Sequence, residues 1–282
     1  MSIFLDFDGT ITAKDTVGEL ANFALQVRAS EGADLKQEWD NVVRAYIADY
    51  SAHVDGYHTG PEGRSLPEHE VEFLREAKDV ETRSLGRVND SCLFRGISGD
   101  KFREAGRELV RKGVVKLRPG FEAFVKERIE QGWRVVVVSV NWSAAFIEGA
   151  IGEVEGVRVV ANEVREGDGV VVGPLVLNRG GVREQRNMTN SQDKLDVVQA
   201  VLEDEGLEGR PAIYFGDSTT DLECLLAADT GFVMSDKEDS SLLQTLRRIG
   251  KEVPHVRDRN ASSRLAWTSN YEDIPNERFI LN

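Results

Sequence analysis

Two aspartates near the start of the chain, Asp6 and Asp8, have the types and spacing of reacting groups. They directly follow the short apolar run 3–5 and precede Gly9, which favours a turn. Two carboxylates held this close repel each other, and a shared proton or a bound metal cation relieves that repulsion. A carboxylate can also act as a nucleophile and form an aspartyl-phosphate. The structural alternative is a plain turn after a strand, where Asp and Gly are both common.

Ser139 and Lys194 are two further polar residues at predicted element ends. Ser139 follows an apolar strand, where its hydroxyl and the next N–H can hold a phosphate oxygen. Helix N-capping is the alternative for this serine. Lys194 lies in the first turn of a predicted helix, where its charge opposes the helix dipole. That position favours a role beside an anion over a solvated surface role.

Asp217 and Asp221 follow another predicted strand, which ends at Gly216. The glycine lets the backbone come close, and Asp217 can complete a carboxylate cage for Mg²⁺. Asp221 also fits the spacing of a capping box that begins at Ser218, so helix capping is an alternative for it.

The elements that must position these residues alternate between strand and helix. Strands are predicted at 3–5, 133–138, 157–160, 211–215 and 231–234, and helices at 121–131, 144–151, 191–205, 222–228 and 240–249. This alternation predicts an α/β fold with a mostly parallel sheet, whose carboxyl edge collects the polar residues. A hairpin is expected within 164–177 and a loop at 178–190. The tail beyond Pro254 is expected to be irregular, with at most one short strand.

Residues 15–116 show helical spacing and no strong strand pattern. They predict a helical domain inserted into a core domain made of residues 1–14 and 117–282. Trp39, Tyr46 and Tyr50 lie on one face of a predicted helix within the insertion. This stripe is expected to pack in the core of the insertion, and a wall for a flat substrate is the alternative.

Composition narrows the class of partner. The formal net charge of −14 and the pI near 4.9 argue against nucleic acid or an anionic membrane as the main partner. No apolar stretch approaches the roughly 18 residues of a membrane span, and no signal peptide is recognisable. The two cysteines form no disulfide framework or zinc motif, so we expect a reduced, cytoplasmic protein.

Taken in chain order, the Asp-x-Asp pair, Ser139, Lys194 and the Gly-Asp-x-x-x-Asp segment at 216–221 resemble the four motifs of the haloacid dehalogenase superfamily, in its phosphatase branch. The resemblance covers about 1–14 and 117–250, and the insertion is placed like the type C1 cap of that family. It implies a Rossmann-like core with an inserted helical cap.

The resemblance also implies roles for individual residues. Asp6 would attack phosphorus, and Asp8 would protonate the leaving alcohol and then deprotonate the attacking water. Mg²⁺ would be held by Asp6, Asp217 and the backbone carbonyl of Asp8, with Asp221 in support. Lys194 would neutralise the phosphate and the carboxylates. The residues expected to bind the substrate are Gly9, Thr10, Ser139, Val140, Asn141 and Lys194.

The activity implied is a Mg²⁺-dependent phosphomonoesterase for a small phosphorylated metabolite that the cap selects. The sequence Ser-Val-Asn-Trp at 139–142 departs from the Ser-Gly-Gly of phosphoserine phosphatases, which puts phosphoserine in doubt. The Asn-Trp-Ser variant and the cap length are more similar to thiamine-monophosphate-type phosphatases. A phosphoserine phosphatase-like enzyme, another phosphotransferase and a non-catalytic module of the same fold are the alternatives.

Overall fold

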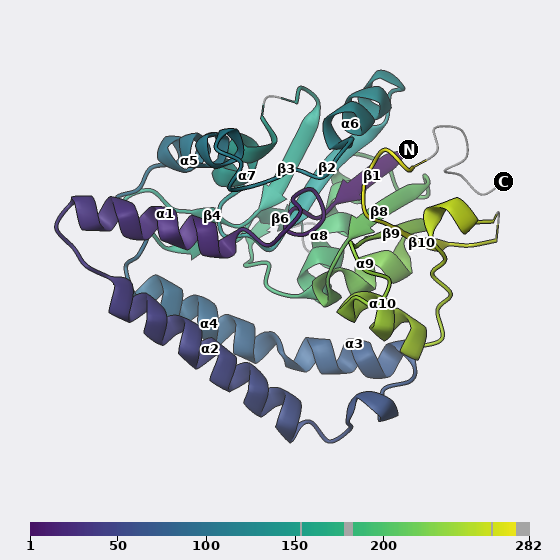
Figure 1. The fold of residues 1–282 in the computed structure, drawn as a ribbon, viewed down its shortest axis with the longest axis horizontal. Helices are drawn as coiled ribbons and strands as arrows, with labels where there is room; N and C mark the ends of the chain where they lie inside the picture. The colour runs from purple at the N-terminus through teal and green to yellow at the C-terminus, as the bar shows by residue number, and fades with distance from the viewer. Residues whose placement is uncertain (153, 178–182, 261, 275–282) are drawn as a thin grey trace.

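A computed structural model describes residues 1–152, 154–177, 183–260 and 262–274 (Figure 1). Its centre is a parallel sheet of six strands in the order β10-β9-β8-β1-β2-β3. The strands are β1 (Ser2–Leu5), β2 (Arg134–Ser139), β3 (Val157–Ala161), β8 (Ala212–Gly216), β9 (Thr230–Met234) and β10 (Leu265–Thr268). Every strand predicted from the sequence is present, and the predicted α/β, Rossmann-like fold is confirmed.

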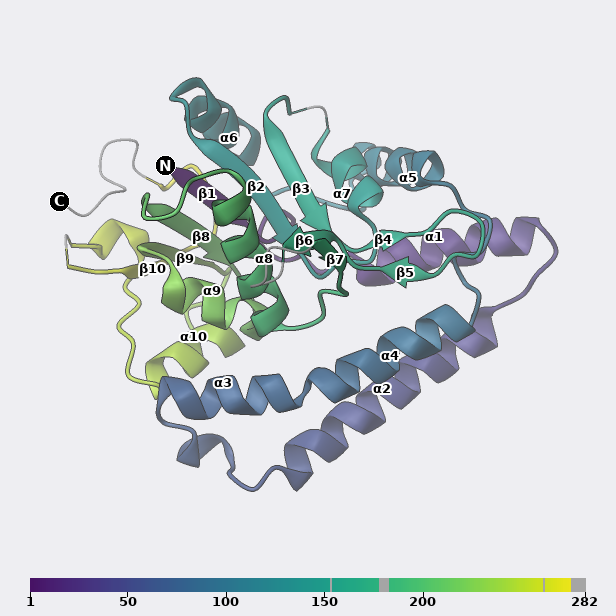
Figure 2. The same cartoon turned by 180° about the vertical axis from the view of Figure 1, so that it is seen from behind.

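Alternating side chains of the central strands enter two separate cores, as expected for a sheet that is buried on both faces. Ile3 and Leu5 of β1 belong to one core and Phe4 to the other. The first core includes residues of α6 (Phe121–Glu130) and α7 (Ala144–Ile151). The second includes residues of α8 (Ser191–Asp204), α9 (Leu222–Ala227) and α10 (Ser241–Arg248), three helices visible in Figure 2.

The chain changes direction at β1, which lies in the middle of the sheet. It passes outward from β1 to β2 and β3, and later crosses back to β8 on the other side of β1. Leu5 therefore pairs with Val137 on one side and with Phe215 on the other. Crevices at the carboxyl ends of such oppositely wound strands are where open α/β sheets bind ligands.

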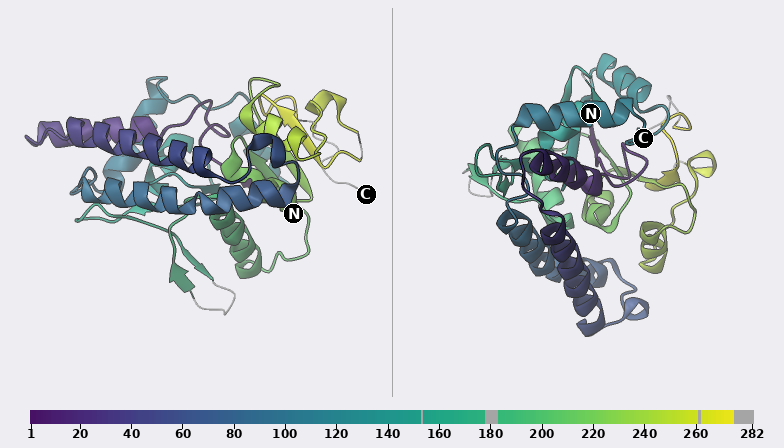
Figure 3. Two further views of the ribbon diagram at one scale, coloured as in Figure 1. Left: turned by 90° about the horizontal axis from the view of Figure 1, so that it is seen from below. Right: turned by 60° about the vertical axis from the view of Figure 1, so that its left-hand side comes forward.

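Five α-helices and one short 3₁₀ helix lie between β1 and α6. They are α1 (Val17–Ser30), α2 (Lys36–Gly56), η1 (Pro61–Gly63), α3 (Pro67–Glu76), α4 (Lys78–Asp90) and α5 (Gly99–Arg111). Figures 1 and 3 show α2 beside α4, and these two helices contact each other. Helix α5 instead packs against α7, next to the sheet. The expected helical insertion is present, while the boundaries of the two domains stay a prediction.

Two short antiparallel pairs follow β3. The expected hairpin is formed by β4 (Glu163–Val164) and β5 (Val171–Val172). A second pair joins β6 (Leu175–Leu177) to β7 (Arg183–Gln185) and projects from the body in Figure 3. The prediction of a loop across 178–190 is therefore wrong at β7, where exposed polar residues gave no strand pattern; residues 178–182 lie outside the described part.

The C-terminal segment contributes more than an irregular tail. Its strand β10 forms one edge of the sheet, and the 3₁₀ helix η3 (Val256–Asp258) precedes that strand. Another 3₁₀ helix, η2 (Thr219–Asp221), lies earlier in the chain, directly after β8. Tyr271 is buried against Phe121 and Phe124, and its hydroxyl donates to the backbone oxygen of Thr10 at 3.1 Å. This segment thus supports the turn that follows Asp8. Within the described residues, no helix is long and apolar enough to cross a membrane.

Candidate active site

Asp6 and Asp8 leave the carboxyl end of β1 at the crevice between β1 and β8. The backbone N–H of Asp6 still donates to Phe215 O of β8 at 2.9 Å, so the sheet holds this residue. Asp6 is buried and Asp8 is half-buried, and both line one cavity. The structure therefore brings the two predicted reacting carboxylates to the same opening.

Asp8 is held by three hydrogen bonds. Its Oδ1 accepts from the backbone N–H and the hydroxyl of Thr16 at 2.7 and 2.6 Å, and its Oδ2 accepts from Asn141 Nδ2 at 2.8 Å. Burial, followed by the nearby charge of Asp15, raises the pKa of Asp8 to about 6, although the bonds from Thr16 and Asn141 lower it. A carboxyl group in this range can give and take a proton near neutral pH.

Lys194 lies beneath the crevice and contacts two carboxylates. Its Nζ is 2.7 Å from Asp6 Oδ1 and 2.7 Å from Asp221 Oδ1, and the lysine is fully buried. Burial alone lowers the pKa of Lys194, but the charges of Asp221 and Asp6 outweigh it and hold that pKa above its ordinary value. The ammonium group is therefore charged, and its position in the first turn of α8 is explained by these partners.

Asp221 is enclosed by donors. Its Oδ1 also accepts from Tyr214 OH at 2.7 Å, and its Oδ2 accepts from the backbone N–H groups of Asp217 and Ser218 at 3.0 and 3.1 Å. The capping box considered from the sequence is present between Ser218 and Asp221. Asp221 does not line the cavity, so it anchors Lys194 and the loop after β8 from below.

Asp217 lines the cavity and completes a group of three carboxylates with Asp6 and the fully buried Asp221. One carboxylate oxygen each from Asp6, Asp217 and Asp221 lie within 4.8 Å of one another. Burial, followed by the charge of Asp221, raises the pKa of Asp217 to about 8. Burial also raises the pKa of Asp6 well above its usual value, with Lys194 opposing the shift. Crowded oxygen donors with raised pKa values fit a hard divalent cation.

Gly9 lies directly beside the carboxylate of Asp217. Its φ is +71°, and a Cβ on it would lie 2.0 Å from Asp217 Oδ2. Only glycine fits this position without moving the carboxylate. Next to it, Thr10 Oγ1 lies 3.5 Å from Asp217 Oδ1. Both residues lie beside Asp217, and neither is among the described residues that line the cavity.

Ser139 is the last residue of β2, one residue beyond the predicted strand end, and Val140 and Asn141 follow it on the other side of β1. Val140 lines the cavity. Ser139 and Asn141 are fully buried, and Ser139 Oγ accepts from the backbone N–H of Asn141 at 3.2 Å. The side chain of Asn141 is engaged with Asp8. Direct contact of these residues with a substrate stays a prediction.

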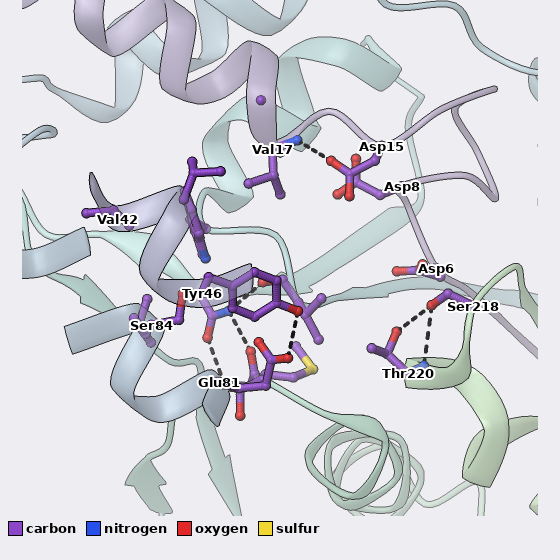
Figure 4. Close-up of a pocket in the computed structure, with 18 of the residues that line it drawn as sticks. Asp6, Asp8, Asp15, Val17, Val42, Tyr46, Glu81, Ser84, Ser218 and Thr220 are labelled. Carbon is purple, nitrogen blue, oxygen red and sulfur yellow. Dashed lines mark hydrogen bonds between the residues drawn. The ribbon is translucent and has the colours of Figure 1, made fainter. Parts of the chain in front are cut away.

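The cavity has a volume of about 480 Å³, within the usual range for small-molecule sites. Asp6, Asp8 and Ser218 lie on one side of it, and residues of α2 and α4 lie on the other (Figure 4). The α2 and α4 wall consists of Trp39, Val42, Val43, Tyr46, Glu81, Ser84 and Leu85. The aromatic stripe is thus divided, because Trp39 and Tyr46 face the cavity while Tyr50 stacks on Tyr46.

The sequence motifs do not single out every residue with contacts to the site, and Thr16, Glu81 and Arg118 are examples. Arg118 donates to Gly9 O at 2.9 Å and to Ser269 O at 2.8 Å, and so joins the first turn to the C-terminal segment. Thr16 stands only eight residues after Asp8, and its nearness at the start of the insertion was an available signal. Glu81 gave none, because a single acidic residue on a helix usually faces solvent.

Several known proteins are similar to this chain in sequence or in fold. The chain is 25% identical over 269 residues to the "Bifunctional TH2 protein, mitochondrial" of Arabidopsis thaliana, covering 88% of this chain but 40% of that protein. It is 27% identical over 264 residues to "Cold tolerance protein 1" of Saccharomyces cerevisiae, covering 82% of this chain and 77% of the relative. The fold is similar to that of cytosolic 5'-nucleotidase IIIB bound to cytidine, with a TM-score of 0.54 at 15% identity over 88% and 78% of the two chains.

A family model described as haloacid dehalogenase-like hydrolase matches residues 3–226, most of the chain. The match includes the ends of β1, β2 and β8, where the predicted motifs lie. It confirms the superfamily that the sequence resembled and the expectation of a hydrolytic enzyme. The protein belongs to the haloacid dehalogenase-like hydrolases.

Proposed function

We propose that the protein is a Mg²⁺-dependent phosphomonoesterase that acts on a small phosphorylated metabolite through an aspartyl-phosphate on Asp6. The observation that carries the proposal is the meeting of Asp6, Asp8 and Asp217 at the floor of one cavity, with Lys194 behind them. Burial and the charges of Asp221 and Asp217 raise the pKa of Asp6, so the ammonium group of Lys194 and a bound cation would together have to favour its anionic form. Asp6 is thereby prepared to attack phosphorus.

Asp8 is the proposed general acid and base. It has to protonate the leaving oxygen as the P–O bond breaks, and then accept a proton from the water that hydrolyses the aspartyl-phosphate. The carboxylate of Asp8 accepts hydrogen bonds from Thr16 and Asn141. These bonds fix its orientation before the substrate binds. Thr16 and Asn141 are therefore positioning residues in this proposal.

Asp6 and Asp217 are the proposed metal ligands, together with the backbone carbonyl of Asp8. Bound Mg²⁺ would supply positive charge to the phosphoryl oxygens. Asp221 supports the site through Lys194 and the backbone after β8, and Gly9 leaves room for the carboxylate of Asp217. Oxygen donors without a His or Cys partner favour Mg²⁺ over zinc.

The segment 15–116 is the proposed cap, and residues 1–14 with 117–282 are the proposed core domain. All proposed reacting groups come from the core, while α2 and α4 supply the opposite wall of the cavity. The cap would thus select the substrate without performing the chemistry. A cytoplasmic location stays a prediction, and the name of the Arabidopsis relative says mitochondrial.

For the substrate itself, a thiamine-monophosphate-like ester is the finer candidate. The aromatic side chains of Trp39, Tyr46 and Trp142 at the cavity favour a flat leaving group. Phosphoserine is disfavoured, because its carboxylate would need a cation and the described residues lining the cavity include no Lys or Arg. The presence of all three proposed reacting and metal-binding carboxylates, Asp6, Asp8 and Asp217, at one cavity favours an enzyme over a non-catalytic module.

The test is hydrolysis of p-nitrophenyl phosphate and of a panel of phosphorylated metabolites by wild type and by Asp6→Asn. The amide keeps the shape of Asp6 but cannot act as the attacking anion, so turnover should fall by much more than tenfold while the thermal unfolding midpoint stays close to wild type. An Asp6→Asn protein within about tenfold of wild type, a barrier difference of roughly 1.4 kcal/mol, would exclude Asp6 as the nucleophile. A wild-type protein inactive on the whole panel would contradict the proposed function.

A further inference from the structure

The charged groups around the cavity are of one sign. Asp15 and Glu81 line it in addition to the three carboxylates assigned to chemistry and metal binding, and no Lys or Arg is found among its described lining residues. Neither Asp15 nor Glu81 forms an ion pair within the described parts of the chain. Once a cation and a phosphate occupy the floor, these two carboxylates remain for the rest of the substrate.

Glu81 is placed on the wall of α4, away from the reacting groups. Its Oε1 accepts a hydrogen bond from Tyr46 OH of α2 at 3.0 Å, which fixes the carboxylate between the two helices. Figure 4 shows this pair on the side of the cavity opposite Asp6 and Asp8. Glu81 is only partly exposed, and burial raises the pKa of its carboxyl group although the bond from Tyr46 lowers it, so a cationic group of a ligand at this wall would stabilise the charged form.

The walls beside Glu81 are aromatic. Trp39 of α2 and Trp142 after β2 meet edge to face, with ring centroids 6.0 Å apart, and both line the cavity. Aromatic faces attract flat rings and cations, the more so when water is excluded. An anionic leaving group would find no Lys or Arg among the described lining residues. It would also be repelled by Glu81 and Asp15.

We infer that Glu81, held by Tyr46, is a specificity-determining residue that recognises a positive charge on a flat leaving group. The substrate class is thus a phosphomonoester whose alcohol part is an aromatic ring that carries a cationic nitrogen. This inference rests on the proposed phosphatase function and adds to it the charge of the substrate and the residue that selects it.

Three matched esters test it: 4-(aminomethyl)phenyl, 4-methylphenyl and 4-carboxyphenyl phosphate, which differ chiefly in charge. We expect wild-type kcat/KM to be highest for the cationic ester and lowest for the anionic one. Glu81→Gln should lower kcat/KM for the cationic ester by roughly tenfold or more, the range of one charged hydrogen bond, and leave the neutral ester within about twofold. Comparing each ester between the two proteins cancels differences in leaving-group reactivity.

Glu76→Gln is the matched control, because Glu76 is exposed at the end of α3 and does not line the cavity. It should leave all three values unchanged. Equal losses on all three esters in Glu81→Gln would overturn the inference and leave the phosphatase function intact. If Glu81→Gln does not fold, the wild-type kcat/KM of each ester divided by the rate of its uncatalysed hydrolysis decides, and equal ratios or a preference for the anionic ester overturns the inference. A wild-type protein that hydrolyses none of these esters or the metabolite panel removes both proposals together.

Discussion

At the scale of single residues, the chemistry depends on how side chains are oriented as well as on which are present. Asp8 is close to Asp6 in sequence, but its direction is set by Thr16 and Asn141, which come from different parts of the chain. Asp6 in turn is oriented by Lys194, whose charge is balanced by Asp221. Loss of an orienting partner should therefore impair turnover without removing any reacting atom.

Thr16→Val should lower kcat by roughly tenfold, because one charge-assisted hydrogen bond to Asp8 is lost while the backbone N–H bond remains. KM should change little, since Thr16 is not among the residues that line the cavity. The measurement is steady-state kinetics with p-nitrophenyl phosphate. Thr16→Ser keeps the hydroxyl and should restore most of kcat; equal losses in both variants would argue against the positioning role.

At the scale of elements, α5 and α7 pack so closely that a glycine of each helix contacts the backbone of the other. A Cβ on Gly149 of α7 would lie 1.9 Å from Arg103 O, and one on Gly106 of α5 would lie 2.2 Å from Phe146 O. This contact ties the last helix of the insertion to the sheet layer.

Gly149→Ala should therefore destabilise the protein by about 1–3 kcal/mol, because the added methyl group overpacks the contact. Gly86→Ala in α4 is the control: a Cβ there meets nothing within 4 Å, so it should stabilise by about 0.5–1 kcal/mol through helix propensity. Urea unfolding monitored by circular dichroism measures both. The prediction would be refuted if the two substitutions shifted the free energy of unfolding in the same direction.

The wall formed by α2 gives a second prediction at this scale. Trp39→Ala should change kcat/KM strongly for esters with large leaving groups and much less for a small ester that barely reaches the wall. Relative values across an ester series provide the measurement. Ile47→Ala, on the same helix but 58% exposed and outside the cavity lining, is the control.

Folding of the Trp39 variant must be checked in parallel, because Trp39 is half-buried against the core and its truncation costs up to the roughly 3–5 kcal/mol of a fully buried aromatic residue. A well-folded Trp39→Ala protein that lost activity equally on large and small esters would assign the cap to the catalytic machinery instead of to substrate selection.

At the scale of the whole molecule, the fold gathers carboxylates from β1 and from the loop after β8 at one edge of the sheet. The net charge of −14 adds to their mutual repulsion. A cation bound only by the folded protein should therefore raise its stability as well as permit activity.

Exhaustive chelation should abolish phosphatase activity, and Mg²⁺ should restore it and raise the thermal unfolding midpoint. At a concentration of 100 times the dissociation constant, the expected stabilisation is about 2.7 kcal/mol. Asp217→Asn should reduce this stabilisation, because one anionic oxygen donor is removed. Full activity in the chelated protein would contradict the metal requirement, whatever the thermal data.

Much of the core could be predicted from the sequence. Apolar runs that end at Asp6, Ser139 and Gly216 mark buried parallel strands, and the strand ends of such a sheet must lie on one edge. The sequence alone therefore determined the fold class, the family resemblance and the set of carboxylates. It also predicted the helix that carries Lys194, since the apolar spacing after Ser191 is strong.

The tertiary structure alone decided which residues from distant segments meet. The exposed strand β7, the support that Tyr271 gives to Thr10, and the contact of Gly149 with Arg103 leave no periodic pattern in the sequence. The same holds for Glu81, which lies at the cavity only because α4 packs on α2. Periodicity reports which face of an element is apolar, whereas the partner of a polar side chain is set by the packing of elements far apart in the chain.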